Sequence, residues 1–504
     1  MPHASFLRTH PDPRPLAVPT TPDATVPAEP ALAVVVEPDF VVPVAPDELP
    51  VPVQEPRPDS SADYRATHSV LLTSLFGPGR PALPPEGSEL CAYGPLLGAR
   101  RPDTGRRVGG IVVPTGRSFR LTEEGLLFAA DIALTHGCPL IVVHSRDALP
   151  EEFPQSVRDL LGDALVLVDL DSVSPSWQPG FATAEDELSS LHRCNDVGWK
   201  RNLGIMLAVR FGWEFVLFLD DDIRAAAQGP TLTPRYLAHA LRVLNEDPDL
   251  MIVGWTLRDF DDNSVVGHAR PLVGLPQDIF ISSGALLLRV GEDTAFFPHG
   301  VYNEDWMLVL QTLAGARDYQ RALAHAGPVH QKPYEAFCPE RARSEETGEI
   351  LAEGLMNLAE DHGPAFARVV SGQYWKRVMA RRRTLLRTIV RGRAGDLLLW
   401  DEGKPPRSDD PVVVCMNTAL WTHQQLHHRK LLAYTTKWRQ DWDFWKSVLV
   451  RLSQEAAGPE TETEIPRLLA SVRARWPHPE AEQGCQDRVA RSASTTDRGR
   501  KVTF

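Results

Sequence analysis

The chain has 504 residues and a formal net charge of −13; 43% of its residues are hydrophobic and 24% are charged. This composition is ordinary for a globular protein with two or three domains and a sizeable core. The negative balance argues against nucleic-acid binding through overall charge. No apolar run approaches the ~18 residues of a membrane span, so none is expected.

The cysteines and the first residues of the chain bear on its compartment. No basic stretch followed by an apolar core opens the sequence, so no secretory signal is expected. The cysteines form no CxxC pair or metal-ligand spacing, which is typical of free thiols in a reducing compartment. They are Cys91, Cys138, Cys194, Cys338, Cys415 and Cys485. The sequence therefore predicts a cytoplasmic location.

Two segments precede the expected core. Residues 1–63 hold 15 of the 44 prolines and ten acids against three arginines, which gives a local charge of −7. Such a segment cannot bury enough apolar surface to order itself, so a disordered, Pro-rich acidic tail is predicted. Residues 64–109 form a lead-in segment, in which 71–76 fit a short element packed on the main domain.

The first regular elements start near residue 110. A strand is predicted over 110–114. A helix should follow, with Thr122 as its N-cap and Glu123 and Glu124 in its first turn, where acids complement the helix dipole. Gly137 is expected to end that helix.

Strands and helices then alternate along the chain. The expected strands cover 139–143, 164–168, 215–220, 250–253 and 285–290, and the expected helices cover 200–210, 234–245 and 306–313. The helix over 234–245 should begin at a Thr233 cap followed by Pro234, a proline at the first helical position. This alternation predicts a three-layer α/β domain over 110–340 with a mainly parallel sheet.

The pattern becomes helical over 341–477, and the polar end, 478–504, is predicted to be disordered. Residues 374–393 carry eight Lys or Arg and no acid, with Trp375 and Met379 among apolar residues at helical spacing. Such a basic amphipathic helix fits peripheral contact with anionic lipid or with a phosphorylated acceptor. Ordinary packing of the apolar stripe beneath a solvated basic face is the alternative.

Three aspartates, Asp220, Asp221 and Asp222, follow the apolar run of 215–219 directly. A strand buried in a parallel sheet delivers such groups to the edge where ligands of open α/β sheets bind. Adjacent carboxylates repel one another, and a hard cation such as Mg²⁺ or Mn²⁺ prefers their oxygens. The run therefore predicts a metal site, in which Asp220 and Asp222 could face one ligand. A solvated acidic turn is the alternative.

A second acidic pair, Glu304 and Asp305, stands in an aromatic setting between Tyr302 and Trp306. Partial burial raises the pKa of a carboxylate towards neutrality, which suits a general base. The pair also lies where a helix is expected to begin, and acids there complement the helix dipole without any catalytic role. Both interpretations stay open on the sequence alone.

Four weaker candidate residues complete the set. Lys200 and Arg201 begin a predicted helix, where cations oppose the dipole, so an anion should compensate; a nucleotide diphosphate and Asp196 are the two candidates. Gly284 could let the backbone approach a ligand, or simply form a turn. His330 is a lone histidine, and such residues are more often structural than metal ligands.

Five segments in this order resemble the GT-A glycosyltransferases, in particular the family 2-like group. They are Ile-Val-Val-Pro-Thr at 111–115, Lys-Arg-Asn-Leu-Gly at 200–204, Phe-Leu-Asp-Asp-Asp-Ile at 218–223, Ser-Gly at 283–284 and Asn-Glu-Asp-Trp at 303–306. The resemblance implies a GT-A three-layer sandwich with a mainly parallel sheet, to which the C-terminal helical region is added.

The resemblance also implies a role for each matching residue. Nucleotide contacts fall on Pro114, Thr115, Asp147, Lys200, Arg201, Asp220, Asp221 and Gly284; metal ligands on Asp222, Asp220 and His330; and catalytic acids on Asp305, as general base, and Glu304 beside it. The implied cofactor is Mn²⁺ or Mg²⁺, and the implied donor is a UDP- or GDP-sugar. Relatives usually have an acidic residue and a Ser-x-Asp where this chain has His-Ser-Arg-Asp at 144–147, which leaves the nucleotide open.

The sequence thus predicts a metal-dependent glycosyltransferase of the hexosyltransferase type that acts on an unknown hydroxyl acceptor. The resemblance implies an inverting mechanism with Asp305 as base, and the sequence leaves open whether the anomeric configuration is inverted or retained. A glycosyltransferase-like protein that binds nucleotide sugars without turnover is one alternative. A sugar nucleotidyltransferase is another, although no Gly-rich, Arg-containing loop follows the first strand.

Overall fold

The structure is a computed structural model that describes residues 73–75, 107–190, 196–226, 231–257, 264–275, 280–331, 335–395 and 408–455. The two segments predicted to be disordered, 1–63 and 478–504, lie outside these residues, as does most of the lead-in segment 64–109. The described residues all belong to one compact unit, Ala62–Phe504. Their helices are nowhere both long and apolar enough to cross a membrane.

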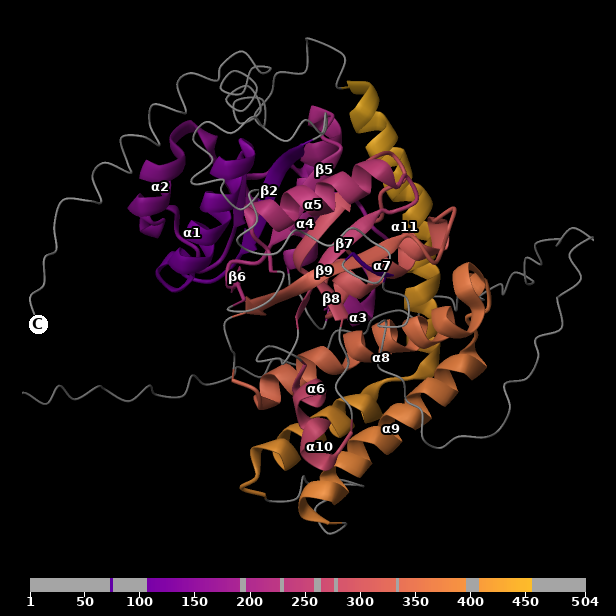
Figure 1. Cartoon of the computed structure of the whole chain (residues 1–504). Helices are drawn as coiled ribbons and strands as arrows, with labels where there is room; N and C mark the ends of the chain where they lie inside the picture. The colour runs from indigo at the N-terminus through magenta and orange to yellow at the C-terminus, as the bar shows by residue number, and fades with distance from the viewer. Residues whose placement is uncertain are drawn as a thin grey trace, which may run out of the picture. The chain divides into compact units, whose positions relative to one another are not determined.

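Four parallel strands form one half of the central sheet (Figure 1). They are β2 (Val108–Thr115), β3 (Leu140–His144), β4 (Leu165–Asp169) and β5 (Phe215–Leu219), in the spatial order β4-β3-β2-β5. Every residue of β3 and β5 is buried, because a strand covered by helices on both faces needs a continuous apolar run. All four strands were expected from such runs.

The other half of the sheet is mixed. It holds β8 (Phe280–Arg289), β7 (Ile252–Leu257), β9 (Leu323–Gln331) and β1 (Thr73–Ser74), and β6 (Ile223–Ala225) pairs with β9. β8 runs antiparallel to both β5 and β7, whereas β9 is parallel to β7 and β1 is parallel to β9. The prediction of a mainly parallel sheet is confirmed for the described strands, and so is a short element within 71–76.

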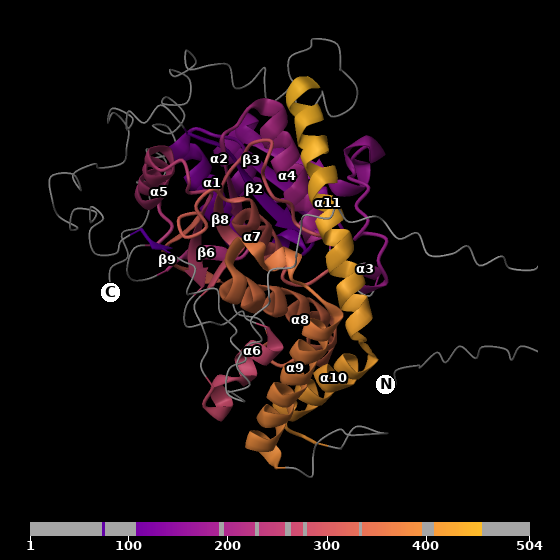
Figure 2. The same cartoon turned by 90° about the vertical axis from the view of Figure 1, so that its right-hand side faces the viewer.

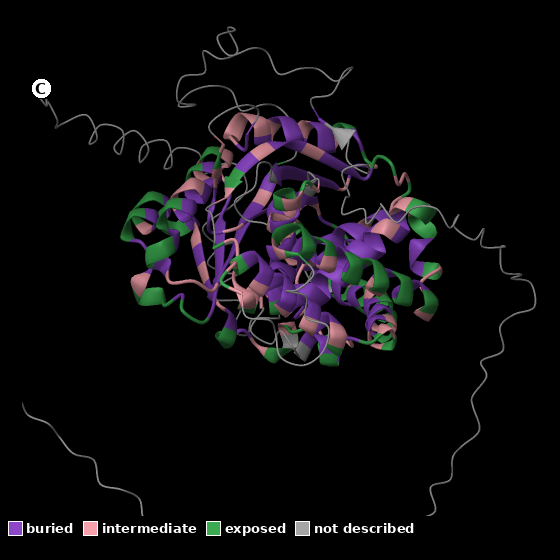
Figure 3. Cartoon of the chain, turned by 90° about the horizontal axis from the view of Figure 1, so that it is seen from below, coloured by how far each residue is buried: buried purple, intermediate pink, exposed green. Residues whose placement is uncertain are grey.

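Helices cover both faces of the sheet, which gives the three layers that the sequence predicts. On β2, Val113 faces a core shared with α1 (Phe119–His136), α2 (Gln155–Leu161) and α5 (Pro234–Glu246). The adjacent Val112 faces a second core, shared with α4 (Val197–Phe211) and α7 (Glu304–Gly315). Successive strand residues point to opposite faces, so one strand serves both cores. Figure 3 shows the burial concentrated in the sheet and the inner helix faces.

One helix boundary differs from its prediction. The N-cap of α1 is Ser118, whose Oγ accepts a hydrogen bond from the backbone N–H of Arg120 at 3.4 Å, and not Thr122. Thr122 lies inside the helix, where its Oγ1 donates to the carbonyl of Phe119 at 3.3 Å. Both residues carry a capping hydroxyl, and the short connection after β2 makes the earlier one the cap. Glu123 and Glu124 consequently lie beyond the first turn.

Other caps agree with the sequence. Gly137 ends α1 in the left-handed conformation, at φ 61°, which a glycine adopts without steric strain. Thr233 caps α5, because its Oγ1 accepts from the N–H of Tyr236 at 3.4 Å. The helix that contains Lys200 starts earlier than predicted, at Val197, so Lys200 is not its first residue.

The helical region follows the last strand, since β9 ends at Gln331 and α8 begins at Pro339. It comprises α8 (Pro339–His362), α9 (Gly372–Ala394), α10 (Pro411–Gln425) and α11 (His428–Glu455). The long helix α11 runs beside α4 and α9 (Figures 1 and 2). The remaining short helices are α3 (Glu187–Ser190), α6 (Val265–Ala269) and 3-10 turns at Pro150–Glu152, Gly162–Ala164, Leu170–Ser172, Pro175–Trp177, Pro271–Val273 and Gly363–Arg368.

Helix α9 shows how the basic segment 374–393 is used. Trp375, Leu386 and Ile389 are fully buried, so the apolar stripe packs inside the protein. The basic side chains are exposed or half-buried, with the exception of Arg382, which is fully buried and paired with three glutamates of α8: Glu346, Glu349 and Glu353. Contact of the exposed basic face with anionic lipid stays a prediction.

Candidate functional site

The three aspartates lie at the carboxyl end of β5, where the chain leaves the sheet. Asp220 still bonds to the neighbouring strand, because its N–H donates to the carbonyl of Gly284 at 2.9 Å. The chain then turns, and the N–H of Ile223 donates back to the carbonyl of Asp220 at 3.2 Å. Strand alternation therefore stops at Leu219, and Asp220 and Asp222 do not follow the two-residue period assumed for them.

Asp221 and Asp222 share one cation, Arg117, which the sequence had not singled out. The Nη2 of Arg117 donates to Asp221 Oδ1 and, at 2.8 Å, to Asp222 Oδ2. Arg117 follows β2 by two residues, and β2 is the neighbour of β5 in the sheet. Parallel neighbours end at the same edge, so a cation just after the first strand was the signal that could have identified this residue.

Burial changes the acidity of Asp221. Its side chain is 2% exposed, and burial, aided by repulsion from Asp222, raises its pKa to about 6. Arg117 and the hydroxyl of Thr115, which donates to Asp221 Oδ2, oppose that rise. Thr115 thus reaches the acids from the last position of β2, with Pro114 beside it in the same strand.

His330 and Asp222 do not face each other. Asp222 Oδ1 accepts a hydrogen bond at 3.3 Å from Nε2 of Gln331, the residue that follows His330 on β9. Adjacent strand residues point to opposite faces, and the side chain of His330 is exposed. The structure therefore brings Gln331 to the aspartates.

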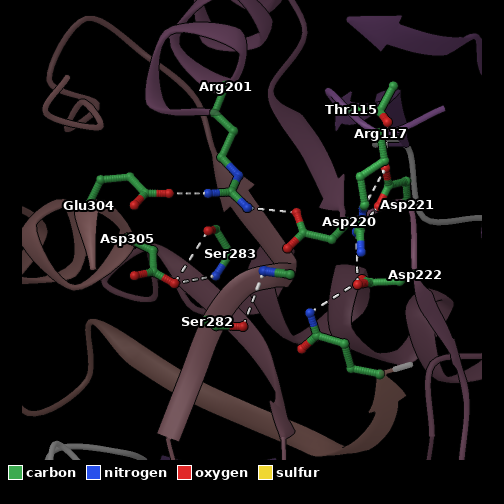
Figure 4. A network of polar contacts seen from close by, with 12 residues as sticks. Thr115, Arg117, Arg201, Asp220, Asp221, Asp222, Ser282, Ser283, Glu304 and Asp305 are labelled. Atoms are coloured by element: carbon green, nitrogen blue, oxygen red, sulfur yellow. Dashed lines mark hydrogen bonds and ion pairs between the residues drawn. The ribbon is translucent and has the colours of Figure 1, made fainter. Parts of the chain in front are cut away.

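Arg201 joins Asp220 to the second acidic pair (Figure 4). Its Nη2 donates to Asp220 Oδ1 at 2.6 Å, and its Nη1 donates to Glu304 Oε1 at 2.5 Å. The guanidinium is buried and lies 5.5 Å from the ring centroid of Phe297. Although burial opposes the charge, the nearby Asp220 and Glu304 raise the pKa of Arg201, so it stays a cation.

Glu304 and Asp305 begin α7 behind Asn303, the N-cap, whose φ of 61° is left-handed. Burial is the largest cause that raises the pKa of both acids, to about 7 for Glu304, while Arg201 opposes the rise. Asp305 Oδ2 accepts from the N–H of Ser283 at 3.0 Å, and Oδ1 accepts from the N–H of Trp306 at 2.9 Å. The pair thus lies at the start of a helix, and burial raises the pKa of both carboxyl groups.

Lys200 contacts the last residue of β2 and an acid that precedes its own helix. Its Nζ donates to the carbonyl of Thr115 at 2.7 Å and to Asp196 Oδ1 at 2.9 Å. Of the two anions considered for it, Asp196 is in place. Burial lowers the pKa of Lys200, against the raising effect of Asp196. Asp196 is also held by the hydroxyl of Ser145 at 2.5 Å.

Two further candidates lie close to this edge. Asp147 is exposed after β3, and its N–H donates to the carbonyl of Gly116 at 3.3 Å, next to Thr115. Gly284 lies on β8, and a Cβ there would lie 3.3 Å from Asp220 Oδ2 and 3.1 Å from Ser282 Oγ. Because glycine has no side chain, the Asp220 carboxylate has room to lie against β8 at Gly284.

The charges at this edge favour a cation. The five carboxylates of Asp220, Asp221, Asp222, Glu304 and Asp305 lie beside two cations, Arg117 and Arg201, whereas Lys200 is paired with Asp196. Acids therefore outnumber cations at this edge, and carboxylate oxygens suit a hard divalent metal. Across the described ranges, however, no three His, Cys, Asp or Glu side chains are grouped closely enough to hold a metal together.

No protein-family model matches the chain, and no curated protein matches its sequence. Among solved structures, it is similar to glucosyl-3-phosphoglycerate synthase from Mycobacterium tuberculosis in complex with Mn²⁺, UDP and phosphoglyceric acid, with 17% identity over 46% of this chain and 72% of that chain and a TM-score of 0.28. The same enzyme with Mn²⁺, UDP-glucose and phosphoglyceric acid matches with 16% identity, 50% and 80% coverage and a TM-score of 0.31. A mycobacterial protein matches with 15% identity, 51% and 74% coverage and a TM-score of 0.30.

Proposed function

We propose that the chain is a metal-dependent glycosyltransferase that moves a sugar from a nucleotide-diphosphate donor to a hydroxyl group of an acceptor. The observation that carries the proposal is the acidic edge of the sheet: Arg201 links the Asp220 carboxylate to Glu304, and Asp221 and Asp222 lie next to them. In open α/β sheets, ligands bind at this carboxyl edge.

The donor would occupy the space in front of β2 and β5. Asp220 is the least buried of the three aspartates, with 23% of its side chain exposed, so it can meet a ligand. We assign the nucleotide to Pro114, Thr115, Asp147, Lys200, Arg201, Asp220, Asp221 and Gly284. A UDP- or GDP-sugar fits this role, and the chain leaves the choice open.

The metal would be held by the oxygens of Asp220 and Asp222, with His330 as the third ligand implied by the family resemblance. Carboxylate oxygens are the ligands that Mn²⁺ and Mg²⁺ take in proteins. When bound, the metal supplies positive charge that offsets the charge developing on the leaving diphosphate. Because the side chain of His330 is exposed and its neighbour Gln331 contacts Asp222, ligation by His330 requires a local rearrangement of that histidine.

The transfer itself needs a proton acceptor, which we assign to Asp305 beside Glu304. The acceptor oxygen would form a bond to the anomeric carbon while the bond from that carbon to the diphosphate oxygen breaks, and the hydroxyl proton would pass to Asp305. This is an inverting displacement. Burial raises the pKa of Asp305 above its ordinary value, which improves it as a base near neutral pH. The two hydrogen bonds from Ser283 and Trp306 would hold the carboxylate in a fixed direction.

A reducing, cytoplasmic setting is part of the proposal. Three cysteines of the described part, Cys138, Cys338 and Cys415, are free thiols. Burial raises the pKa of Cys138 and of Cys415 to about 12, so neither thiol is reactive at neutral pH.

A panel of nucleotide sugars that includes UDP-glucose and GDP-mannose tests the function. Nucleotide release would be followed with and without Mn²⁺ and with a set of hydroxyl acceptors. We expect metal-dependent release with one nucleotide, and a loss of at least about 100-fold in Asp222→Asn. Asp131→Asn, which removes an exposed acid of α1, is the matched control and should keep full activity.

The same panel separates the alternatives. Thermal stabilisation by a nucleotide sugar without any nucleotide release would favour the binding protein. Pyrophosphate release from a nucleoside triphosphate and a sugar phosphate would favour the nucleotidyltransferase. Undiminished turnover of Asp222→Asn would contradict the assignment of this aspartate.

A further inference from the structure

Arg117 lies on the oxygen atoms that a metal would use. Its Nη2 donates to Asp222 Oδ2 at 2.8 Å and also to Asp221 Oδ1, and its Nε lies 3.4 Å from Asp221 Oδ2. We infer that Arg117 is an internal counter-ion that competes with the divalent metal for Asp222 and must leave before the metal binds. This inference rests on the proposed function, because it takes Asp222 as a metal ligand.

Competition follows from charge and from position. A guanidinium and a divalent cation both bind carboxylate oxygens by electrostatic attraction, and one oxygen directed at Nη2 cannot also be directed at a metal in the same place. A metal that takes the position of Nη2 at Asp222 Oδ2 must therefore displace a charge-assisted hydrogen bond. The affinity of the protein for the metal is lowered by the free energy of that bond.

The aspartates are fixed and the arginine can move. Only 2% of the Asp221 side chain and 3% of the Asp222 side chain are exposed, whereas 34% of the Arg117 side chain is exposed. Asp221 keeps a second partner in the hydroxyl of Thr115, and Asp222 keeps the amide of Gln331. When Arg117 swings out towards solvent, both acids still have a protein donor.

The backbone of the acidic turn is also held in place. Helix α1 packs directly against it at Gly125, where an added Cβ would lie 2.0 Å from the carbonyl oxygen of Asp221. With the helix in this contact, the acidic turn has no space to move towards α1. Release of the metal-binding oxygen therefore depends on movement of the arginine side chain, which makes Arg117 a positioning residue.

Direct binding of Mn²⁺, without any substrate, tests the inference. Free Mn²⁺ would be counted by electron paramagnetic resonance in titrations of the full chain. Arg117→Met should lower the dissociation constant for Mn²⁺ by about tenfold or more, because the competitor is gone. Arg117→Lys keeps a cation and should stay near the wild type. Asp222→Asn should weaken binding strongly.

The control is Arg120→Met, which removes a cation three residues away that pairs with Glu152 on the surface. It changes the net charge by the same amount, so an equal tightening there would show a general charge effect and overturn the inference. Circular dichroism would check that each variant folds; if Arg117→Met does not, Arg117→Gln removes the charge while it keeps a polar side chain.

The outcomes separate the two proposals. If Asp222→Asn loses Mn²⁺ and Arg117→Met does not gain affinity, the metal site stands and the competition is wrong. If neither the wild type nor Arg117→Met binds Mn²⁺, the metal-dependent function fails and the competition fails with it. Tight binding that appears only in Arg117→Met would be the strongest support.

Discussion

Arg201 and Asp220 form the ion pair on which the site depends. Arg201 lies on α4, and Asp220 directly follows β5. The Nη2 of Arg201 donates to Oδ1 of Asp220 at 2.6 Å. The same guanidinium holds Glu304, 103 residues further along the chain, at 2.5 Å. Because the arginine is buried, these two carboxylates depend on it for compensation of their charge.

Replacement of Arg201 should destabilise the fold. Arg201→Met leaves Glu304 buried without its cation, and loss of one partner of a buried pair typically lowers the free energy of unfolding by about 3–5 kcal/mol. Urea denaturation would measure the change. The double variant Arg201→Met/Glu304→Gln should recover part of the loss, and Arg120→Met on the surface should show none. A variant as stable as the wild type would show that the pair contributes nothing to stability.

Stability should depend on pH through Glu304. Burial raises its pKa from 4.5 to about 7, so between these values the folded state holds a proton that the unfolded state has released. The stabilisation from this proton is fully present below about 4.5 and is lost as the pH rises through about 7. The free energy of unfolding of Glu304→Gln should therefore fall less steeply over this range. Chemical denaturation at a series of pH values measures both slopes, and parallel slopes would contradict the expectation.

Gly125 should tolerate no side chain. A Cβ at this position of α1 would lie 2.0 Å from the carbonyl oxygen of Asp221, far inside van der Waals contact. Gly125→Ala should thus lower the free energy of unfolding by about 1–3 kcal/mol, although alanine favours helices. Gly315→Ala, at the end of α7, has no atom within 4 Å of the added Cβ and serves as the control. Thermal and urea denaturation compare the two, and equal stability of both variants would show that the turn gives way.

Asp305→Asn tests the proposed base. The amide has a single acceptor oxygen, so it keeps only one of the two hydrogen bonds from Ser283 and Trp306, and it cannot take the acceptor proton. We expect kcat to fall by about 10²–10⁴-fold with little change in KM for the donor. Steady-state kinetics would be measured across pH. The kcat of the wild type should fall at low pH as the proposed base is protonated, and Asp305→Asn should lack this fall. A change confined to KM would instead indicate a binding role.

Local patterns along the chain were sufficient for much of the fold. The apolar run at 215–219 predicted a buried strand with acids at its end, and the structure has β5 at Phe215–Leu219. Gly137 and Thr233 predicted a helix end and a helix start, and both are confirmed. At α1 the local signal was ambiguous, because Ser118 and Thr122 both carry a capping hydroxyl, and the first of them is the cap.

The composition of the candidate site was only partly predictable. The carboxylates, Lys200 and Arg201 were recognisable from their sequence setting, and so was Asp196 as a partner of Lys200, but the other partners were not. Arg117 lies 104 residues from Asp221, and no short pattern connects residues so far apart. Gln331 and His330 are neighbours on β9, and only the register of β9 with β6 determines which of them faces Asp222.

The sequence by itself therefore determined the alternation of strands and helices and the presence of acids at the end of β5, because periodicity and capping act over a few residues. The tertiary structure decided which cation serves which acid: Arg117 for Asp221 and Asp222, and Arg201 for Asp220 and Glu304. Those pairings arise where separate strands and helices meet, and a distance of a few ångströms between side chains is set only when the elements pack.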